Sequence, residues 1–546
     1  MEREIFLGLD LSTQSLTALA ASVQSGVVYQ ETLHFDQSYP RYGTRGGIQP
    51  SGDPLRAHAD PLMWVEALED MLRRLQQAGL TRRIAAMAVS AQQHGTVYLS
   101  HQAASGLAGM KPSTALAAGL AGIFSRRTCP TWMDSSTSRE CREITSALGG
   151  EAAVAELTGS AAAERFAGPQ IRKFWKEEPD AYARTAHIAL ISSFLTALLT
   201  GGIAPVDAGD GYGTNLADIR CGDWSRDALS ACAPALRRRL PHLVVRDKTI
   251  GAVSPSLAER FGFHPETRVV VGSGDNPNSL VGLGLIGDPG RHAISLGTSD
   301  TYFGYLPVLP DGVRPEGHIF GSADGRFMFL ICLKNGSLAR ERVKEDHGLS
   351  WEQFSRILKK TPPGNRGRVL LPYFLPEITP LILDAGVRRY GGLAAEDAAG
   401  NVRAVVEAQA MALYLHSGWV GKRPERIIAT AGGSQNRGLL QVTAEVFGAE
   451  VQTLEVRESA ALGAALRAAH AWLDEHGRAV GWGELFQAVA RPEAGRVIRP
   501  KPGASAPYHA PQGLLSLYAA CERHASRSGP FPEEAIRAFR ATFPEA

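Results

Sequence analysis

The chain opens with three short apolar runs separated by polar turns. Residues 4–10 and 16–23 flank the polar turn 12–15, and Gly26 leads into a third run at 27–35. Short apolar runs bounded by turn residues are typical of β-strands. The pattern therefore predicts a β-meander whose first turn carries hydroxyl side chains.

Strand and helix patterns alternate through the rest of the first half. Residues 63–75 place apolar side chains at helical spacing, and strand-like runs follow at 84–90 and 96–99. The stretch 135–199 is mainly helical in pattern, and the strand pattern returns at 269–271. Interleaved strands and helices indicate an α/β domain.

The second half of the chain repeats the pattern of the first. Residues 292–296 are strand-like, 297–300 form a polar turn, and 301–305 are strand-like again, as in 9–17. Each half therefore opens with a hairpin that presents Ser and Thr hydroxyls at its tip. We expect two α/β domains that share this hairpin.

The turn-rich segment 287–290 is the best candidate for the boundary between these domains. We therefore expect an N-terminal domain at 1–287 and a C-terminal domain at 288–505. Residues 506–546 are expected to form an appendage, because the end of the chain is Pro-rich and then only weakly helical.

Composition and charge exclude some functional classes. The 546 residues are 44% apolar and 21% charged, which suits large buried cores. Fifty-seven basic and 55 acidic residues give a net charge of +2. This near balance argues against a nucleic-acid-binding protein and against binding to an anionic membrane. The basic run 237–239 is therefore interpreted as a solvated helix face.

Three features predict a cytoplasmic protein. The six cysteines are scattered and show no metal-ligand spacing, which is typical of a reducing compartment. The N-terminal residues lack the basic start and apolar stretch of a signal peptide. The most membrane-like segment, 187–206, contains Ser, Thr, Gly and Pro, and is interpreted as a buried helix that ends at Gly201 and Gly202.

The familiar glycine-rich nucleotide motifs do not explain this chain. No Gly-x4-Gly-Lys-Ser/Thr loop occurs in the sequence. A Gly-x-Gly-x-x-Gly run does occur at 282–287, but it follows a helical pattern instead of the strand that a dinucleotide site requires. Phosphate binding must therefore be sought elsewhere.

The two hairpin tips are stronger phosphate candidates. At 8–14 a tight turn can aim successive backbone N–H groups and hydroxyls at a phosphate. Asp10 precedes the turn, where its carboxylate can orient Mg²⁺ directly or through water. Asp, Ser and Thr also form ordinary hairpin turns, but two such tips, one in each half, favour a phosphate clamp. The candidate ligands are Ser12, Thr13 and Gln14 of the first tip and Gly297, Thr298 and Ser299 of the second.

A third glycine-containing turn lies at 431–436. It follows the strand-like run 427–429 and precedes the helical pattern at 438–447. Gly432 and Gly433 would let a nucleotide lie on the backbone, with the helix N-terminus facing its phosphates. The alternative is a helix entry that needs glycine only for packing.

Asp275 and His94 are candidates for chemistry on a substrate. Asp275 ends a strongly apolar strand in a Gly-flanked turn, where a carboxylate can act as a general base. Alternatively, Asp275 or Asn276 caps a helix that begins at Pro277, and both roles can coexist. His94 is either a hydroxyl-binding donor or a loop histidine satisfied by the protein, and the residues alone favour the second.

The order and spacing of these motifs resemble the FGGY carbohydrate kinases. The similar segments are 8–14, 272–276, 295–299 and 432–436. That family belongs to the sugar kinase and actin superfamily, which implies two ribonuclease-H-like α/β domains around a central ATP cleft. Further segments, within a resemblance that covers roughly 5–472, are similar to the animal-type members that phosphorylate xylulose: 35–36, 43–47, 63–65, 92–95, 132–136, 164–166, 317–320, 334–337 and 377–380.

The resemblance implies an enzyme that uses ATP and Mg²⁺ to convert D-xylulose to D-xylulose 5-phosphate. It assigns sugar binding to His94, Arg165, Asp275 and Asn276, with Asp275 as the general base. It assigns the nucleotide to Trp351, Gly432, Gly433 and Asn436. The alternatives are a kinase of another ketose or polyol such as ribulose, a non-catalytic sugar sensor and an actin-like assembly ATPase. We expect a monomer or a homodimer without nucleic-acid or membrane partners.

Overall fold

The computed structural model describes residues 4–454, 458–490 and 492–545, which group into two compact units. The first unit contains the chain up to Gly287, Tyr305–Met328 and the segment that starts at Glu458. The second contains Asp288–Gly304, the segment that starts at Phe329 and the C-terminal segment that starts at Pro492. Each unit is therefore assembled from pieces that lie far apart in the sequence.

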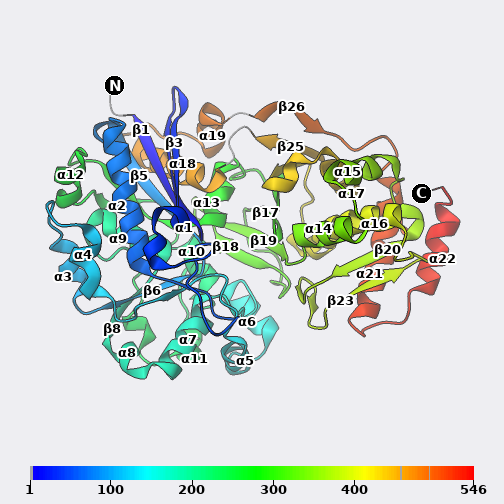
Figure 1. Cartoon of the computed structure of the whole chain (residues 1–546), viewed down its shortest axis with the longest axis horizontal. Helices are drawn as coiled ribbons and strands as arrows, with labels where there is room; N and C mark the ends of the chain where they lie inside the picture. Colours follow the sequence, from blue (N-terminus) through cyan, green and yellow to red (C-terminus); the bar gives the residue numbers. More distant parts are fainter. Residues whose placement is uncertain (1–3, 455–457, 491, 546) are drawn as a thin grey trace. The chain divides into compact units, whose positions relative to one another are not determined.

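A large mixed sheet forms the centre of the first unit (Figure 1). Its strands follow the order β13 (Thr249–Ala252), β14 (Arg268–Val270), β5 (Ile84–Ala91), β1 (Ile5–Leu11), β2 (Ser15–Ser22) and β3 (Gly26–His34), with β15 (Ser273–Gly274) also paired to β5. The meander β1–β2–β3 is antiparallel, whereas β5 is parallel to β1, β14 and β15. The predicted meander and the strand at 84–90 are confirmed.

Burial explains why these segments become strands. Every residue of β1 is buried, as expected for a central strand covered on both faces, whereas most of β3, at the sheet edge, is half-buried or exposed. The predicted helix at 63–75 is confirmed as α2 (Pro61–Gln77), which starts at the N-cap Asp60. Its buried face, which includes Trp64 and Leu68, joins the core of this sheet.

The register of three parallel strands brings polar residues to one edge of the sheet. Asp10 of β1 lies opposite Ser90 of β5, and Ser90 lies opposite Ser273 of β15 on the other side. All three positions lie at the carboxyl ends of their strands, where ligands bind in open α/β sheets. The sheet therefore directs the two sequence candidates Asp10 and Asp275 towards the same edge.

The sheet of the second unit has the same local plan. Its path runs through β19 (Phe327–Leu333), β17 (Asp300–Leu306), β16 (Arg291–Leu296), β24 (Arg426–Thr430), β25 (Glu450–Leu454) and β26 (Pro492–Ile498). The pair β16–β17 is antiparallel and the pair β16–β24 is parallel, which matches β1–β2 and β1–β5. The predicted repeat of the first hairpin is confirmed.

Helices complete both units. In the first unit α18 (Ser459–Glu475) lies beside β1 and β5, although it comes from the last fifth of the chain (Figure 1). The second unit contains α15 (Trp351–Lys360), α16 (Ala398–His416) and α17 (Arg437–Phe447). Its C-terminal helices are α20 (Ala506–His509), α21 (Leu514–Ala525) and α22 (Glu533–Thr542), and α21 packs on α16.

The segment 187–206 differs from its predicted single helix. Residues Thr185–Leu190 form strand β8, and the helix α9 covers only Ile191–Thr200. The predicted end is right, because Gly201 adopts the left-handed conformation of a C-terminal cap. Within the described ranges, no helix is both long and apolar enough to cross a bilayer.

Candidate active site

The first unit holds two partly or fully buried carboxylates at the carboxyl ends of its strands. Asp10 is 8% exposed, and its Oδ1 accepts a hydrogen bond from Ser90 Oγ at 2.6 Å. Burial raises the pKa of Asp10 to about 6, although the Ser90 hydrogen bond opposes this shift. A cation beside Asp10 would oppose this shift and favour the ionised carboxylate, which is the form that binds Mg²⁺.

Asp275 is the first residue of α13 (Asp275–Gly282), which directly follows β15. The N-cap is Gly274, so the expected helix start at Pro277 is wrong by two residues, and neither Asp275 nor Asn276 is the cap. Asp275 Oδ1 accepts from the Asn276 backbone N–H at 2.9 Å. Burial, followed by the negative charge of Asp10, raises the pKa of Asp275 to about 7. This carboxyl can accept and release a proton at neutral pH.

His94 lies in the turn after β5 with a positive φ of 73°. Its Nδ1 donates to the carbonyl oxygen of Gly213 at 2.7 Å, and its ring stacks on Phe166 at 4.3 Å. Burial, followed by the charge of Arg165, lowers the pKa of His94 to about 3. The ring is therefore neutral, with its proton on Nδ1, so Nε2 can only accept a hydrogen bond. The Gly213 contact agrees with the alternative of a loop histidine satisfied by the protein, and sugar binding by His94 stays a prediction.

Arg165 lies near His94 and contacts two further rings, those of Phe166 and His318. Its Nη2 donates to His318 Nε2 at 3.0 Å, and its guanidinium lies 5.6 Å from the Phe166 ring. His318 Nδ1 can then donate to Ser160 Oγ at 3.1 Å. Burial and the Arg165 charge lower the pKa of His318 well below its ordinary value, which keeps this ring neutral. His318 belongs to the resembling segment 317–320, but no residue pattern marked it as part of a site.

Gln93 connects the His94 turn to the Asp275 turn. Its Oε1 accepts from Asn276 Nδ2 at 2.9 Å, and its Nε2 donates to the Gly209 carbonyl at 3.1 Å. The contact is close, because a Cβ on Gly274 would lie 2.2 Å from Gln93 Cγ. Sequence reasoning missed Ser90 and Gln93, since neither residue type is distinctive for a site.

The first hairpin tip has mixed character. Ser12 Oγ accepts from the backbone N–H of Ser15 at 3.1 Å, which is the turn-forming role that the alternative interpretation described. Thr13 Oγ1 accepts from Trp132 Nε1 at 2.8 Å and can donate to Gln92 Oε1 at 3.3 Å. Gln14 is exposed. The phosphate-binding role of this tip stays a prediction.

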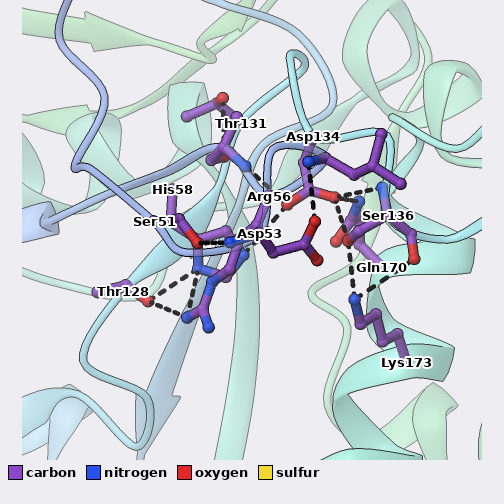
Figure 2. Close-up of polar contacts among 12 residues, drawn as sticks. Ser51, Asp53, Arg56, His58, Thr128, Thr131, Asp134, Ser136, Gln170 and Lys173 are labelled. Atoms are coloured by element: carbon purple, nitrogen blue, oxygen red, sulfur yellow. Dashed lines mark hydrogen bonds and ion pairs between the residues drawn. The ribbon is translucent and has the colours of Figure 1, made fainter. Parts of the chain in front are cut away.

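Figure 2 shows that the buried Asp134 side chain lies within a cluster of polar contacts. Asp134 accepts from Ala57 N at 3.0 Å, Ser136 Oγ at 2.6 Å and Gln170 Nε2 at 2.8 Å, and lies 3.4 Å from His58 Nε2. Burial alone would raise the pKa of Asp134, but the hydrogen bonds from His58, Ser136 and Gln170 hold it below its ordinary value. These contacts hold the chain two residues after Trp132, whose Nε1 donates to Thr13 Oγ1.

In the second unit, the other hairpin tip and the 431–436 turn follow neighbouring parallel strands. Ser295 of β16 lies opposite Thr430 of β24, so Gly297, Thr298 and Ser299 emerge beside Gly432 and Gly433. A Cβ on Gly433 would lie 2.6 Å from Leu296 Cβ, whereas one on Gly432 would meet no described atom within 4 Å. Gly433 therefore has a packing role, while the backbone at Gly432 is open.

Asn436 and Trp351 lie on neighbouring helices of the second unit. Asn436 is the N-cap of α17 and accepts from Gly438 N at 2.9 Å, while its Nδ2 donates to Ser355 Oγ of α15 at 2.9 Å. Trp351 begins α15 one turn before Ser355, is 42% exposed and packs against Phe354 at 5.4 Å. An exposed indole next to a helix entry is suited to stacking on a planar base.

Metal binding is constrained by the same geometry. Across the described residues, no group of three or more His, Cys, Asp and Glu side chains is arranged to hold a metal ion. Mg²⁺ commonly uses one or two carboxylates and completes its shell with water and substrate phosphates. Asp10 fits that requirement, because its carboxyl has a raised pKa that a nearby cation would lower.

Comparisons with known proteins agree with this fold. The models of the N-terminal and C-terminal domains of the FGGY family of carbohydrate kinases match residues 127–282 and 292–472. A xylulose kinase of Rattus norvegicus is 40% identical over 95% of this chain and 97% of its own length. Xylulose kinase 2 of Arabidopsis thaliana is 39% identical over 86% and 87%.

Solved structures show the same architecture at lower identity. The xylulose kinase of Rhodospirillum rubrum superposes with a TM-score of 0.77 at 21% identity, covering 99% of this chain and 98% of that one. The gluconate kinase of Lactobacillus acidophilus has a TM-score of 0.79 at 18% identity, with 97% and 99% covered. The expected fold class, two ribonuclease-H-like α/β domains, is thereby confirmed. The chain belongs to the FGGY family of carbohydrate kinases.

Proposed function

We propose that this carbohydrate kinase transfers the γ-phosphate of ATP to the C5 hydroxyl of D-xylulose. The observation that carries the proposal is Asp275, a carboxyl whose pKa is raised to about 7 beside the polar residues Asn276 and Gln93. The substrate class is supported by the 40% identity to the rat xylulose kinase over nearly the whole of both chains.

Asp275 is proposed as the general base. Phosphoryl transfer needs positioning and charge stabilisation more than covalent help. The attacking hydroxyl must nevertheless lose its proton, and a carboxylate with a pKa near the working pH is the best acceptor. Burial supplies most of this tuning, and the nearby negative charge of Asp10 adds to it by making ionisation of Asp275 less favourable.

The sugar is proposed to bind against His94, Arg165 and Asn276. A ketopentose presents several hydroxyls and one carbonyl, so its site needs both donors and acceptors. Arg165 can only donate, neutral His94 can accept a hydroxyl proton at Nε2, and the Asn276 amide can do both. The Phe166 ring stacks on His94 and adds an apolar surface to the proposed sugar site.

The nucleotide is proposed to bind the second unit through Trp351, Gly432, Gly433 and Asn436. The exposed Trp351 ring would stack on adenine. The open backbone at Gly432 would accept the nucleotide, and the tip Gly297, Thr298 and Ser299 would donate N–H groups and hydroxyls to its phosphates. Ser12, Thr13 and Gln14 of the first hairpin are also proposed to bind phosphate.

Asp10 is proposed to hold Mg²⁺ directly or through water. When bound, the ion would neutralise charge on the β- and γ-phosphates. Asp10 and the nearby Asp275 would keep their carboxylates ionised more easily beside it, because an opposite charge lowers a carboxyl pKa. The proposed setting is the cytoplasm, which suits the six scattered cysteines, and the chain is proposed to act as a monomer or homodimer.

A coupled assay of ADP release tests the substrate. Purified protein with MgATP should turn over D-xylulose faster than L-xylulose, D-ribulose, L-ribulose or glycerol. A clear preference for another sugar would replace the substrate while leaving the kinase class intact. Absence of sugar-dependent ADP release, with each sugar still raising the melting temperature, would instead indicate the non-catalytic sensor.

A further inference from the structure

Arg467 of α18 is a fully buried cation in the interior of the first unit. It is 1% exposed. Its Nε donates to Asp247 Oδ1 and Oδ2 at 2.8 and 2.9 Å, its Nη2 to Asp207 Oδ2 at 3.2 Å, and its Nη1 to Asn278 Oδ1 at 3.3 Å. Long cationic side chains are rarely buried unless they are paired. The three partners come from three other segments of the unit, so Arg467 ties them together.

The first branch leads from Arg467 to the turn that carries Asp275. Asn278 is completely buried on α13, and its Nδ2 donates to the carbonyl oxygens of Ser273 and Gly274 at 3.1 and 2.9 Å. These carbonyls belong to the two residues immediately before Asp275. Arg467 donates to the amide oxygen of Asn278, so it orients the amide nitrogen that donates to this turn.

The second branch leads to the residues proposed to bind the sugar. Asp207 caps the short helix α10 (Ala208–Gly211) by accepting from Asp210 N at 3.0 Å. This helix and the residues that follow it supply two carbonyl oxygens: that of Gly209 in α10 accepts from Gln93, and that of Gly213 accepts from His94. Arg467 therefore contacts Asn278, which holds the Asp275 turn, and Asp207, which caps the helix next to the His94 and Gln93 contacts.

The backbone of α18 also packs closely against β1, which carries Asp10, and against α13, which begins at Asp275. A Cβ on Gly463 would lie 1.8 Å from the Asn278 carbonyl oxygen, and one on Gly8 would lie 1.9 Å from the Ala461 carbonyl oxygen. Gly8 lies two residues before Asp10 on β1. Since backbones approach this closely only at glycine, α18 fixes the positions of β1 and α13 relative to each other.

Charge explains why arginine occupies this position. Asp207, Asp210 and Asp247 gather in this interior together with Asp275, and burial, followed by repulsion from Asp207 and Asp275, raises the pKa of Asp210 well above its ordinary value. Asp210 Oδ2 accepts from Ser192 Oγ at 2.5 Å, while its Oδ1 is buried without a hydrogen-bond partner among the described residues. Arg467 supplies a counter-charge, and its planar fork can reach three partners where lysine has a single nitrogen.

We propose that Arg467 is a positioning residue for phosphoryl transfer, acting through Asn278 and Asp207 on the Asp275 turn and on the sugar-binding residues. The proposal rests on the assignment of Asp275 as general base. A displacement of about 1 Å at a reacting group can lower a rate by about 10²-fold. Arg467 touches none of the reacting groups itself.

The test compares Arg467→Lys and Arg467→Met with Arg403→Met, a control in the second unit. Arg403 is 2% exposed and is paired with Glu407 at 2.7 Å and Glu445 at 3.2 Å, so it matches Arg467 in burial and pairing. We expect Arg467→Met to lower kcat, per folded molecule and at saturating ATP, by about 10–100-fold. The KM for ATP should change little. Arg403→Met should lower the melting temperature without this loss of kcat.

Arg467→Lys separates positioning from a merely structural role. It keeps the charge but not the fork, so we expect it to recover most of the melting temperature and only part of kcat. Recovery of kcat and melting temperature in parallel, or an equal kcat loss in Arg403→Met, would overturn the proposal. If Arg467→Met does not fold, Asn278→Ala decides, because it removes the first branch alone and should lower kcat. An unchanged kcat in folded Asn278→Ala would then refute positioning through Asn278.

Asp275→Asn in the same series separates the two proposals. Full activity of Asp275→Asn would refute the general base. Full activity of the folded Arg467 variants alongside an inactive Asp275→Asn would refute only the positioning role.

Discussion

Asp275 and Asp10 lie at the carboxyl ends of two strands that flank β5, and burial together with the negative charge of Asp10 raises the pKa of Asp275 to about 7. The relationship follows from strand register, because β1 and β15 pair with the same central strand. It gives one carboxyl of the pair the proton affinity of a base and leaves the other beside it as a candidate cation ligand.

The first prediction concerns catalysis by Asp275. Asp275→Asn keeps the shape of the side chain but cannot accept the hydroxyl proton, so kcat should fall by about 10² or more. The KM for the sugar should change much less, because an amide can still bind a hydroxyl. Steady-state kinetics with D-xylulose and MgATP provides the measurement. Since the helix cap is Gly274, the substitution removes no cap, and a fully active Asn variant would exclude the base role.

The second prediction concerns the pH dependence of the reaction. Asp275 must be ionised to act as a base, so kcat/KM for the sugar should fall about tenfold per pH unit below the pKa of Asp275 and level off above it. That pKa is about 7 in the protein alone, and bound Mg²⁺ should lower it. His94 should not add to this limb, because its pKa of about 3 keeps the ring neutral throughout the range. A flat profile between pH 5.5 and 8 would show that ionisation of Asp275 does not limit the reaction.

The third prediction concerns stability. The folded-state pKa of Asp275 is raised from 3.8 to about 7, so its contribution to stability is present below pH 3.8 and lost as the pH rises through 7. Asp275→Asn removes that penalty. The variant should therefore be more stable than the parent at pH 8, by about 1–3 kcal/mol after allowance for partial exposure, and the gain should shrink towards pH 4. Urea unfolding at both pH values measures the difference; an equal gain at both would rule out ionisation as its cause.

The fourth prediction separates packing from nucleotide binding at the glycine pair. Gly433→Ala should destabilise the second unit, because the new Cβ would lie 2.6 Å from Leu296 Cβ. Gly432→Ala meets no described atom within 4 Å and should leave the melting temperature nearly unchanged. If ATP lies on the Gly432 backbone, the KM for ATP should nevertheless rise in this variant, with the sugar KM constant. An unaltered KM for ATP in Gly432→Ala would contradict nucleotide binding at the Gly432 backbone and would leave only the packing role of Gly433.

The fifth prediction concerns recognition of the sugar by His94. His94→Ala removes a buried acceptor at Nε2 and the ring that stacks on Phe166, so the KM for the sugar should rise about tenfold or more. The KM for ATP should stay close to that of the parent, because the residues proposed for the nucleotide lie elsewhere. A matching rise in both constants would indicate general damage to the fold, which a lowered melting temperature would confirm.

The sequence by itself determined the local elements and the repeated hairpins. Apolar runs, turn residues and helical spacing are properties of neighbouring residues, so β1–β2, α2 and the β16–β17 hairpin could be predicted directly. The Gly-flanked Asp275 was visible for the same reason, as an acid in a turn after an apolar strand. The helix start was misplaced because the N-cap is Gly274, which has no side chain that could mark it as a cap in the sequence.

Only the tertiary structure decided which distant residues meet. The approach of Asp10 to Asp275 depends on the register of two strands against β5, and the neutral acceptor form of His94 depends on the carbonyl of Gly213. Arg467 looks like any polar position on a helix in the sequence, yet it is buried among Asp207, Asp247 and Asn278. Burial and long-range pairing set the pKa values and the hydrogen-bond roles, and neither is encoded in local spacing.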